Sequence, residues 1–146
     1  MSDWQSIATP LIQRWESFRA QSYLCPAGVW TIGWGSTGPD IKQGMRWSLD
    51  QADIRFAHDL KKFGDGVSAL LKVPVTAGEM AALTSFAYNV GLSALKGSTL
   101  LRKLNAGDRT GAKAEFGRWV YGTTNGKRIK LKGLVARRAD EARVFG

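Results

Sequence analysis

The stretch ESFRAQSYLCPAGVWTIGWG, residues 16–35, contains the change of pattern that decides the fold. Its central residues, Cys25–Gly28, are typical of a turn. The residues that follow, Val29–Gly35, are aromatic or β-branched and are interrupted by glycines, which is typical of strands. We predict a small antiparallel sheet from Tyr23 to about Met45. Such a sheet is too small to be stable unless it packs against other elements.

A short helix is predicted before this sheet. Thr9 and Pro10 indicate its start, because Thr is a good cap and Pro is favoured at the first helical position. The helix is expected to end near Glu16. A carboxylate at this end opposes the helix dipole, which makes Glu16 a candidate functional residue. A solvated glutamate at a helix end is the alternative.

The rest of the chain has mainly helical patterns. Ser48 and Gln51 form a capping box that predicts a connecting helix over about 49–63, which Gly64 and Gly66 are expected to bend or end. Further helices are predicted from Thr76 to Asn89, from Ser98, from Asp108 and from Leu134 to Phe145, with a basic, glycine-containing loop over 122–133.

Together these elements predict an α+β fold that is predominantly helical and forms one domain over residues 1–146. A β-containing lobe is expected over about 20–47. A larger helical lobe is expected over about 65–146, with the first helix packed on it and the helix over about 49–63 connecting the two lobes. The cleft between the lobes is the expected place for a ligand.

The composition indicates which classes of partner the protein can attract and in which cellular compartment it is made. The net charge is +9, which favours polyanions such as nucleic acid, an anionic membrane or an acidic bacterial envelope. The single cysteine, Cys25, excludes an internal disulfide. The first five residues lack the features of a secretory signal, and no window approaches the roughly 18 apolar residues of a membrane span. We expect synthesis in the cytoplasm without a signal peptide.

Residues 16–35 closely resemble the active-site segment of phage-type lysozymes, glycoside hydrolase family 24. That family places a Glu, eight residues, an Asp, five residues and a Thr ahead of Ile-Gly-x-Gly, and Glu16, Cys25 and Thr31 stand at this spacing. Other stretches also resemble the family, so that the likeness covers roughly residues 10–145. They are residues 86–91, 98–108 and 133–141.

The resemblance implies a lysozyme-like fold with two lobes. It also implies a muramidase that cleaves the β-1,4 bond between N-acetylmuramic acid and N-acetylglucosamine in peptidoglycan, for host lysis. In the family the Glu is the general acid, and the Asp and Thr hold the attacking water. Glu16 is therefore the expected acid and Thr31 an expected ligand of the water, although Thr is also common in strands for structural reasons. The resemblance further implies a monomer that reaches the wall after holin-type release.

Cys25 departs from the family pattern, because it stands where the Asp is expected. A thiol has an ordinary pKa of about 8.5, so it is mostly uncharged at neutral pH unless its surroundings lower the pKa. As a thiol it can hold a water weakly, and as a thiolate it can act as a base or as a nucleophile. A half-buried cysteine with a packing role in the turn is the alternative. An inverting outcome is expected if water attacks, and a nucleophilic Cys25 would reverse it.

Two residues on a predicted helix and one on the hairpin are candidate substrate contacts. By resemblance, Tyr88 and Asn89 lie on the helical wall of the cleft, where an aromatic ring and an amide suit N-acetylated sugars. Core packing is an equal alternative for Tyr88. Trp34 alternates with Trp30 along the hairpin, and at least one of the two is expected in the core.

A polar network is expected to support the general acid. Many family members carry His after Ile-Gly-x-Gly, where it joins a network with the Glu and an Arg from the C-terminal region. This chain has Ser36 at that position, which offers only a hydroxyl. The arginine is Arg137 or Arg138, which spacing does not distinguish. At least one of the two is expected to lie on the surface.

Other readings of the function remain open from the sequence. A lytic transglycosylase cuts the same bond with one carboxylic acid, and a wall-binding relic would keep the cleft without chemistry. Specific nucleic-acid binding has only the charge in its favour. His58 has no partner at ligand spacing, so we expect no metal, and no cofactor is expected. The run Lys127–Lys132 fits anionic envelope polymers or a solvated basic hairpin or loop.

Overall fold

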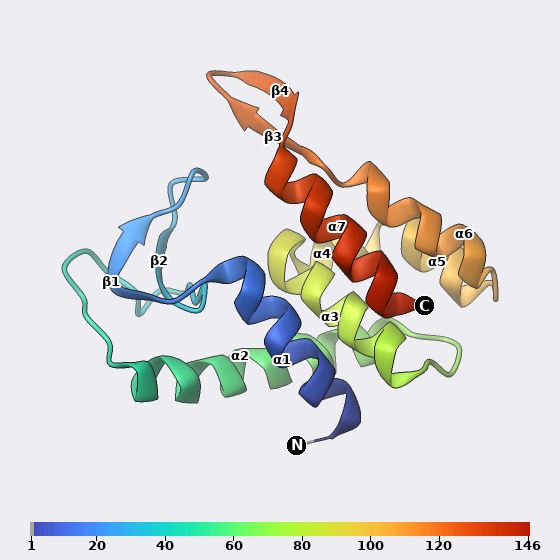
Figure 1. The fold of residues 1–146 in the computed structure, drawn as a ribbon, viewed down its shortest axis with the longest axis horizontal. Coiled ribbons are helices and arrows are strands. Elements are labelled where there is room, and N and C mark those ends of the chain that lie inside the picture. Colours follow the sequence, from blue (N-terminus) through green and yellow to red (C-terminus); the bar gives the residue numbers. More distant parts are fainter. Residues whose placement is uncertain (1) are drawn as a thin grey trace.

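A computed structural model of the protein describes residues 2–146, so Met1, the first of the N-terminal residues considered above, lies outside it. Seven α-helices, a 3-10 helix and two antiparallel hairpins follow one another in this part of the chain (Figure 1). Their bounds are α1 Asp3–Glu16, β1 Arg19–Leu24, β2 Trp30–Gly33, α2 Leu49–Leu70, α3 Ala77–Val90, α4 Leu92–Lys96, α5 Thr99–Asn105, α6 Arg109–Glu115, η1 Phe116–Arg118, β3 Tyr121–Thr124, β4 Lys127–Lys130 and α7 Lys132–Phe145.

The helical lobe is built around α3. All residues from Glu79 to Ala87 are buried, because α1, α2 and α7 pack against this helix. A helix that is buried all round must be apolar on every face, and α3 is nearly so. On one side Phe86 makes edge-to-face contacts with Phe116 and Trp119, which closes the core below α7.

The β lobe consists of the β1–β2 hairpin and the loop that leads to α2. The hairpin pairs Tyr23 with Thr31, and Gln21 pairs with Arg46 further along the loop. The prediction of a small antiparallel sheet between helical segments is therefore confirmed, as is the predominantly helical α+β fold with two lobes (Figure 1). No helix of residues 2–146 has the length and apolar character needed to cross a bilayer.

The predicted start of the first helix is wrong. Helix α1 begins at Asp3 instead of Pro10, because the Gln5 side chain accepts a hydrogen bond from the Ser2 amide and caps the first turn. Pro10 lies inside the helix and is exposed, so its ring meets solvent rather than the core. The predicted end at Glu16 is confirmed.

The predicted end of the connecting helix is also wrong. Helix α2 continues through Gly64 and Gly66 to Leu70. A methyl group at Gly64 would overlap the Trp4 indole, and one at Gly66 would overlap Leu92. These glycines therefore allow neighbouring elements to pack closely against an unbroken helix.

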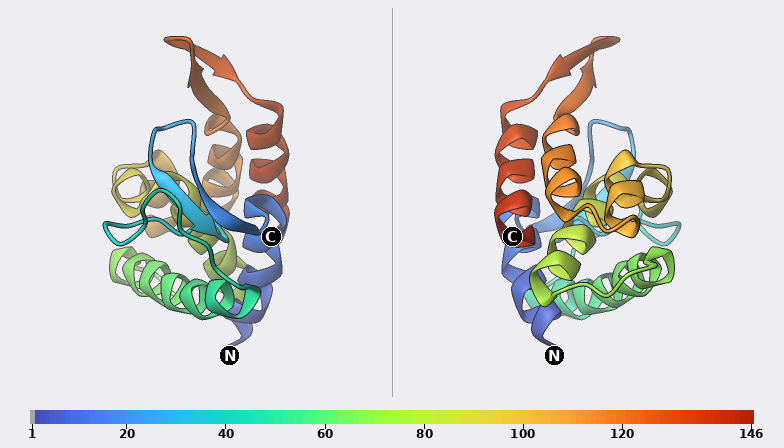
Figure 2. Two further views of the ribbon diagram at one scale, coloured as in Figure 1. Left: turned by 90° about the vertical axis from the view of Figure 1, so that its left-hand side faces the viewer. Right: turned by 90° about the vertical axis from the view of Figure 1, so that its right-hand side faces the viewer.

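The segment predicted as a basic loop over 122–133 is a hairpin followed by the first residues of α7. Strands β3 and β4 pair from Tyr121 and Lys130 to Thr124 and Lys127. Asn125 and Gly126 form the two-residue turn, both with positive φ, which is the preferred hairpin geometry for an Asn-Gly pair. This hairpin projects from the helical lobe, as the two side views show (Figure 2).

Candidate active site

A cleft of about 400 Å³ separates the β1–β2 hairpin from the helical lobe. Three of the residues singled out by their spacing, Glu16, Cys25 and Thr31, all line it. Tyr88 and Asn89 line the opposite, helical wall. The remaining lining residues are Tyr23, Val29, Gly35, Thr37, Asp59, Lys62, Phe63, Val90 and Gly91.

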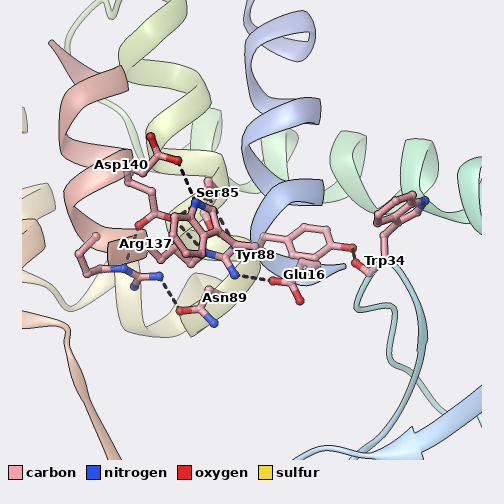
Figure 3. A network of polar contacts seen from close by, with 10 residues as sticks. Glu16, Trp34, Ser85, Tyr88, Asn89, Arg137 and Asp140 are labelled. Carbon is pink, nitrogen blue, oxygen red and sulfur yellow. Dashed lines mark hydrogen bonds and ion pairs between the residues drawn. The ribbon is translucent and has the colours of Figure 1, made fainter. Parts of the chain in front are cut away.

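Glu16 is the last residue of α1, and its carboxyl group is held from two sides (Figure 3). Arg137 Nη1 donates to Glu16 Oε2 over 2.6 Å, and the Glu16 side chain is only 18% exposed. On the other side lies Gly35, where a methyl group would overlap Glu16 Oε1. Directly after Glu16 the chain turns sharply through Ser17, whose φ of 62° is rare for a residue with a side chain.

Arg137 is itself fixed by a buried network below the cleft. Its Nε lies 3.3 Å from Glu141 Oε2, and its Nη2 donates to the Ser85 carbonyl over 3.2 Å. The Ser85 hydroxyl donates to the same Glu141 oxygen over 2.5 Å. Burial raises the pKa of Glu141, although the two neighbouring guanidinium groups oppose this. The network gives Arg137 one orientation, with its free end directed at Glu16.

Arg138 supports the helical wall of the cleft through Asn89. Its Nη2 donates to Asn89 Oδ1 over 2.6 Å, and it forms an ion pair with Glu141 at 2.9 Å. Burial lowers its pKa to about 10. The expectation that Arg137 or Arg138 lies on the surface is wrong, because α7 packs on α3 and buries both side chains.

The β wall places a thiol and a hydroxyl side by side along the hairpin. Cys25 follows β1 and its amide donates to the Val29 carbonyl, which also accepts from the Thr31 hydroxyl over 3.0 Å. Burial opposes ionisation of the Cys25 thiol. The backbone amides of the turn, together with the Thr31 hydroxyl, outweigh this and hold the Cys25 pKa below its usual value.

Trp34 and Ser36 lie outside the lining of the cleft. The Trp34 indole donates to Asp53 over 2.8 Å, and its carbonyl accepts from the Tyr88 hydroxyl over 2.7 Å. Burial raises the pKa of Tyr88, so this hydroxyl remains a donor. Ser36 is buried and donates to Asp59 over 2.7 Å. Both residues therefore fix the segment that faces Glu16 rather than line the cleft.

Comparison with known proteins identifies the family. The sequence pattern of the family described as Phage lysozyme matches residues 13–141. The chain belongs to the phage lysozyme family. It is 39% identical over 135 residues to an endolysin of Acyrthosiphon pisum secondary endosymbiont phage 1, covering 92% of each chain. It is 42% identical over 137 residues to an endolysin of Bacillus phage B103, but spans only 51% of that relative.

Solved structures agree with this family. The muramidase domain of SpmX from Asticaccaulis excentricus superposes with a TM-score of 0.87 at 33% identity, covering 95% of this chain and 94% of that one. The endolysin of Escherichia coli O157:H7 phage FAHEc1 superposes with a TM-score of 0.84 at 34% identity, over 93% and 88% of the two chains. Membership of this family makes the chain a lysozyme-type glycoside hydrolase.

In this phage lysozyme family member, sequence reasoning missed Asp59 and Glu141. Asp59 lines the cleft and accepts from Ser36 and from Arg55 Nε, the latter over 3.0 Å. It interrupts the apolar stripe of α2, and a carboxylate on a buried helix face is the pattern that could have revealed it. Glu141 is three and four residues after the two arginines, so helical spacing alone places all three on one face.

No group of three or more His, Cys, Asp or Glu side chains among residues 2–146 is arranged to hold a metal ion. His58 is exposed on α2 and lies 3.7 Å from Asp59.

Proposed function

We infer that the chain is a muramidase that hydrolyses the β-1,4 bond between N-acetylmuramic acid and N-acetylglucosamine in peptidoglycan, for lysis of a bacterial host. The observation that carries this function is Glu16 in a two-walled cleft, held by Arg137 and faced by the Cys25–Thr31 wall. Family membership and the endolysin relatives support the same substrate.

Glu16 is proposed as the general acid. Glycoside hydrolysis requires a carboxylic acid that protonates the leaving oxygen as the bond to the anomeric carbon breaks. Arg137 holds one oxygen of Glu16, and the second oxygen lies against Gly35, where the absence of a side chain leaves room for it. Because Gly35 lines the cleft, this second oxygen is placed at the cleft wall, where the proton passes to the glycosidic oxygen.

Thr31 and Cys25 are proposed to hold the water that attacks the sugar from the other face. The lowered Cys25 pKa increases the fraction of thiolate near neutral pH, and a thiolate accepts a proton from water as the oxygen bonds to the anomeric carbon. Water delivered opposite the leaving group inverts the anomeric centre. The products are a new hydroxyl on each sugar, and the proton taken up by Cys25 returns to Glu16 through solvent.

Tyr88 and Asn89 are proposed to bind the N-acetylated sugars on the helical wall. The guanidinium of Arg138 has only donors, so it binds Asn89 through the amide oxygen and leaves the amide nitrogen for the cleft. That nitrogen can donate to an acetamido carbonyl. Trp34 and Ser36 act indirectly, Trp34 through the hydrogen bond that fixes Tyr88 and Ser36 through Asp59.

Mass spectrometry of fragments released from purified peptidoglycan tests this function. Fragments that end in reducing N-acetylmuramic acid are expected from the unmodified chain, and Glu16→Gln is expected to release essentially none while keeping its melting temperature. Fragments that end in anhydromuramic acid would instead indicate a transglycosylase in which Glu16 acts alone. Intact folding with unchanged release by Glu16→Gln would refute the assigned acid.

We also propose that the protein acts as a monomer and reaches the wall from the cytoplasm through a holin-type opening. The relatives named endolysins support action on the wall of a host cell. Light scattering in solution tests the monomer, with a mass of 16.0 kDa as the expected result. Expression in a bacterium with and without a holin tests the route, and lysis only with the holin is expected.

A further inference from the structure

The β3–β4 hairpin is an exposed basic arm that the mechanism above leaves unexplained. We define the basic arm as residues 121–130. All four residues of β4 are exposed, and three of them are Lys127, Arg128 and Lys130. The base of the arm is closed by a hydrogen bond from the Leu131 amide to the Val120 carbonyl over 2.9 Å. Isolated two-stranded hairpins are only marginally stable in water, and here Arg128 also lines a hollow together with Thr99 and Trp119 of the helical lobe.

Two of the three cations of the basic arm lie on the same face of the hairpin. Arg128 is opposite Thr123 and Lys130 is opposite Tyr121, so that these four residues share one face of the hairpin. The Arg128 guanidinium lies 3.8 Å from the centroid of the Tyr121 ring. Stacking on the ring restricts the guanidinium and leaves its N–H groups without a partner on the ring. One face of the arm therefore presents two cations, one of them held in place by an aromatic ring.

The basic arm stands at one end of the cleft. It leads directly into α7, whose Arg137 reaches Glu16 in the site. In both Figure 1 and Figure 2 the tip of the arm extends beyond the turn of the β1–β2 hairpin, on the same side of the molecule. That turn ends at Val29, which lines the cleft opposite Asn89. A polymer that enters the cleft at this end passes the arm.

We propose that the basic arm binds the carboxylates of the peptide stems carried by the glycan strand in the cleft. The inference rests on the proposed function, because it assigns a part of the same substrate to a second surface. The sugar rings of such a strand occupy the cleft, and its free carboxylates lie on the peptides that branch from it. A guanidinium binds a carboxylate in a bidentate manner. Lys130 on the same face and Lys127 on the other face of the arm add long-range attraction.

Two variants with the same change in charge test this assignment. The arm variant Lys127→Gln, Arg128→Gln, Lys130→Gln removes three positive charges from the exposed hairpin. The control variant Lys72→Gln, Arg102→Gln, Lys113→Gln removes two lysines and one arginine that are also exposed and do not line the cleft. A third variant, Lys127→Arg, Arg128→Lys, Lys130→Arg, keeps the charge of the arm.

The substrates are intact peptidoglycan, purified free of phosphate polymers and lipid, and the same glycan after an amidase has removed the peptides. On intact peptidoglycan we expect kcat/KM of the arm variant to fall about tenfold through KM, an estimate from three exposed charge pairs. The control and charge-conserving variants should stay within about twofold. On the peptide-free glycan the arm variant should match the unmodified chain.

Equal losses in the arm and control variants would show an effect of net charge only and overturn the inference. An equal loss on both substrates would also overturn it, because the arm would then act on the glycan or on the fold. So would a loss that appears only when phosphate polymers are left on the wall. Failure of the proposed function is a separate result, since the unmodified chain would then release no reducing muramic ends from either substrate.

Discussion

Glu16 depends on a small residue as much as on its ion pair. Gly35 has a φ of +82°, and a methyl group there would overlap Oε1 of Glu16. In the Gly35→Ala variant the carboxyl group must therefore move away from the hairpin. A displacement of about 1 Å at a catalytic group can lower the rate about 100-fold, so we expect kcat to fall between 10- and 100-fold. Steady-state kinetics on peptidoglycan measure this loss.

A matched glycine separates this effect from backbone strain. Gly44 has a φ of +81°, and no atom lies near the place of a Cβ. Gly44→Ala therefore forces alanine into the same left-handed conformation, at a cost of about 1 kcal/mol, without affecting Glu16. Both variants should melt a few degrees lower, and only Gly35→Ala should lose activity. Equal activity in the two variants would mean that Gly35 is required for the fold alone.

Cys25 is the residue whose role the pH profile can decide. Since the turn amides and Thr31 lower its pKa, the thiolate should form at lower pH than in a free cysteine. Iodoacetamide labelling should accordingly accelerate with a midpoint at lower pH than that of free cysteine. The activity of the unmodified chain should rise through the same midpoint.

Substitution at Cys25 completes this prediction. Cys25→Asp supplies a base that is already ionised at pH 6, so it should keep or raise activity and remove the rise with pH. Cys25→Ala should lower kcat by about 10- to 100-fold with little change in KM, as expected for loss of a base. If both variants keep the parent's activity and pH profile, Cys25 serves only to pack the turn.

At the scale of elements, alanine substitutions at two helical glycines, Gly64 and Gly133, should change stability in opposite directions. Alanine is favoured over glycine in a helix by about 1 kcal/mol when nothing else changes. At Gly64 in α2 a methyl group overlaps the Trp4 indole, and such overpacking costs about 1–3 kcal/mol. Gly64→Ala should therefore lower the free energy of unfolding despite the better propensity. Urea titration measures the change.

Gly133 in α7 is the control for Gly64. It lies in the first turn of the helix, and no atom is near the place of its Cβ. Gly133→Ala should raise the free energy of unfolding by about 0.5–1 kcal/mol, because the unfolded chain loses conformational freedom and the folded chain gains no clash. A loss of stability at both positions would contradict the role assigned to Trp4.

The elements that local chemistry specifies are the ones that the sequence predicts best. The capping boxes at Ser48 and Thr76 predict the starts of α2 and α3, and both side chains accept the expected amide. The predicted start of α1 is wrong because Pro10 resembles a first helical residue, although Trp4, Ala8 and Ile12 continue the apolar stripe back to the cap at Ser2. The sequence left the β3–β4 hairpin open as an alternative to a loop although Asn125–Gly126 is a strong turn pair, because strands with so many charges give a weak strand signal.

At the scale of the whole molecule, the candidate site combines local spacing with distant contacts. The spacing of Glu16, Cys25 and Thr31 requires no more than one helix end and one hairpin, so a resemblance to a known segment predicts it. The contact between Glu16 and Arg137 joins residues 121 positions apart and depends on how α1 and α7 pack on α3. No local pattern distinguishes Arg137 from Arg138, and only the packing assigns each to its partner.

The first and last helices are also joined by Asp140, which makes the stability of the fold depend on pH. Trp15 Nε1 in α1 donates to Asp140 over 2.9 Å, and Arg143 lies 2.6 Å from the same carboxylate (Figure 3 labels Asp140). Burial opposes ionisation of Asp140, but Arg143 and Trp15 outweigh it and hold its pKa below the usual range. The carboxylate therefore contributes stability at neutral pH.

This contribution should be lost in acid. Because the pKa of Asp140 is lower in the folded chain, the unfolded chain takes up the proton first as pH falls below about 4. Asp140→Asn should thus lower the free energy of unfolding by about 1–2 kcal/mol at pH 7, and the difference from the parent should shrink toward pH 3. Thermal melts across this range measure it. Asp65→Asn, which breaks the exposed pair with Lys61, should change stability by less than about 0.5 kcal/mol. A pH-independent effect of Asp140→Asn would mean that the Trp15 contact depends on shape rather than charge.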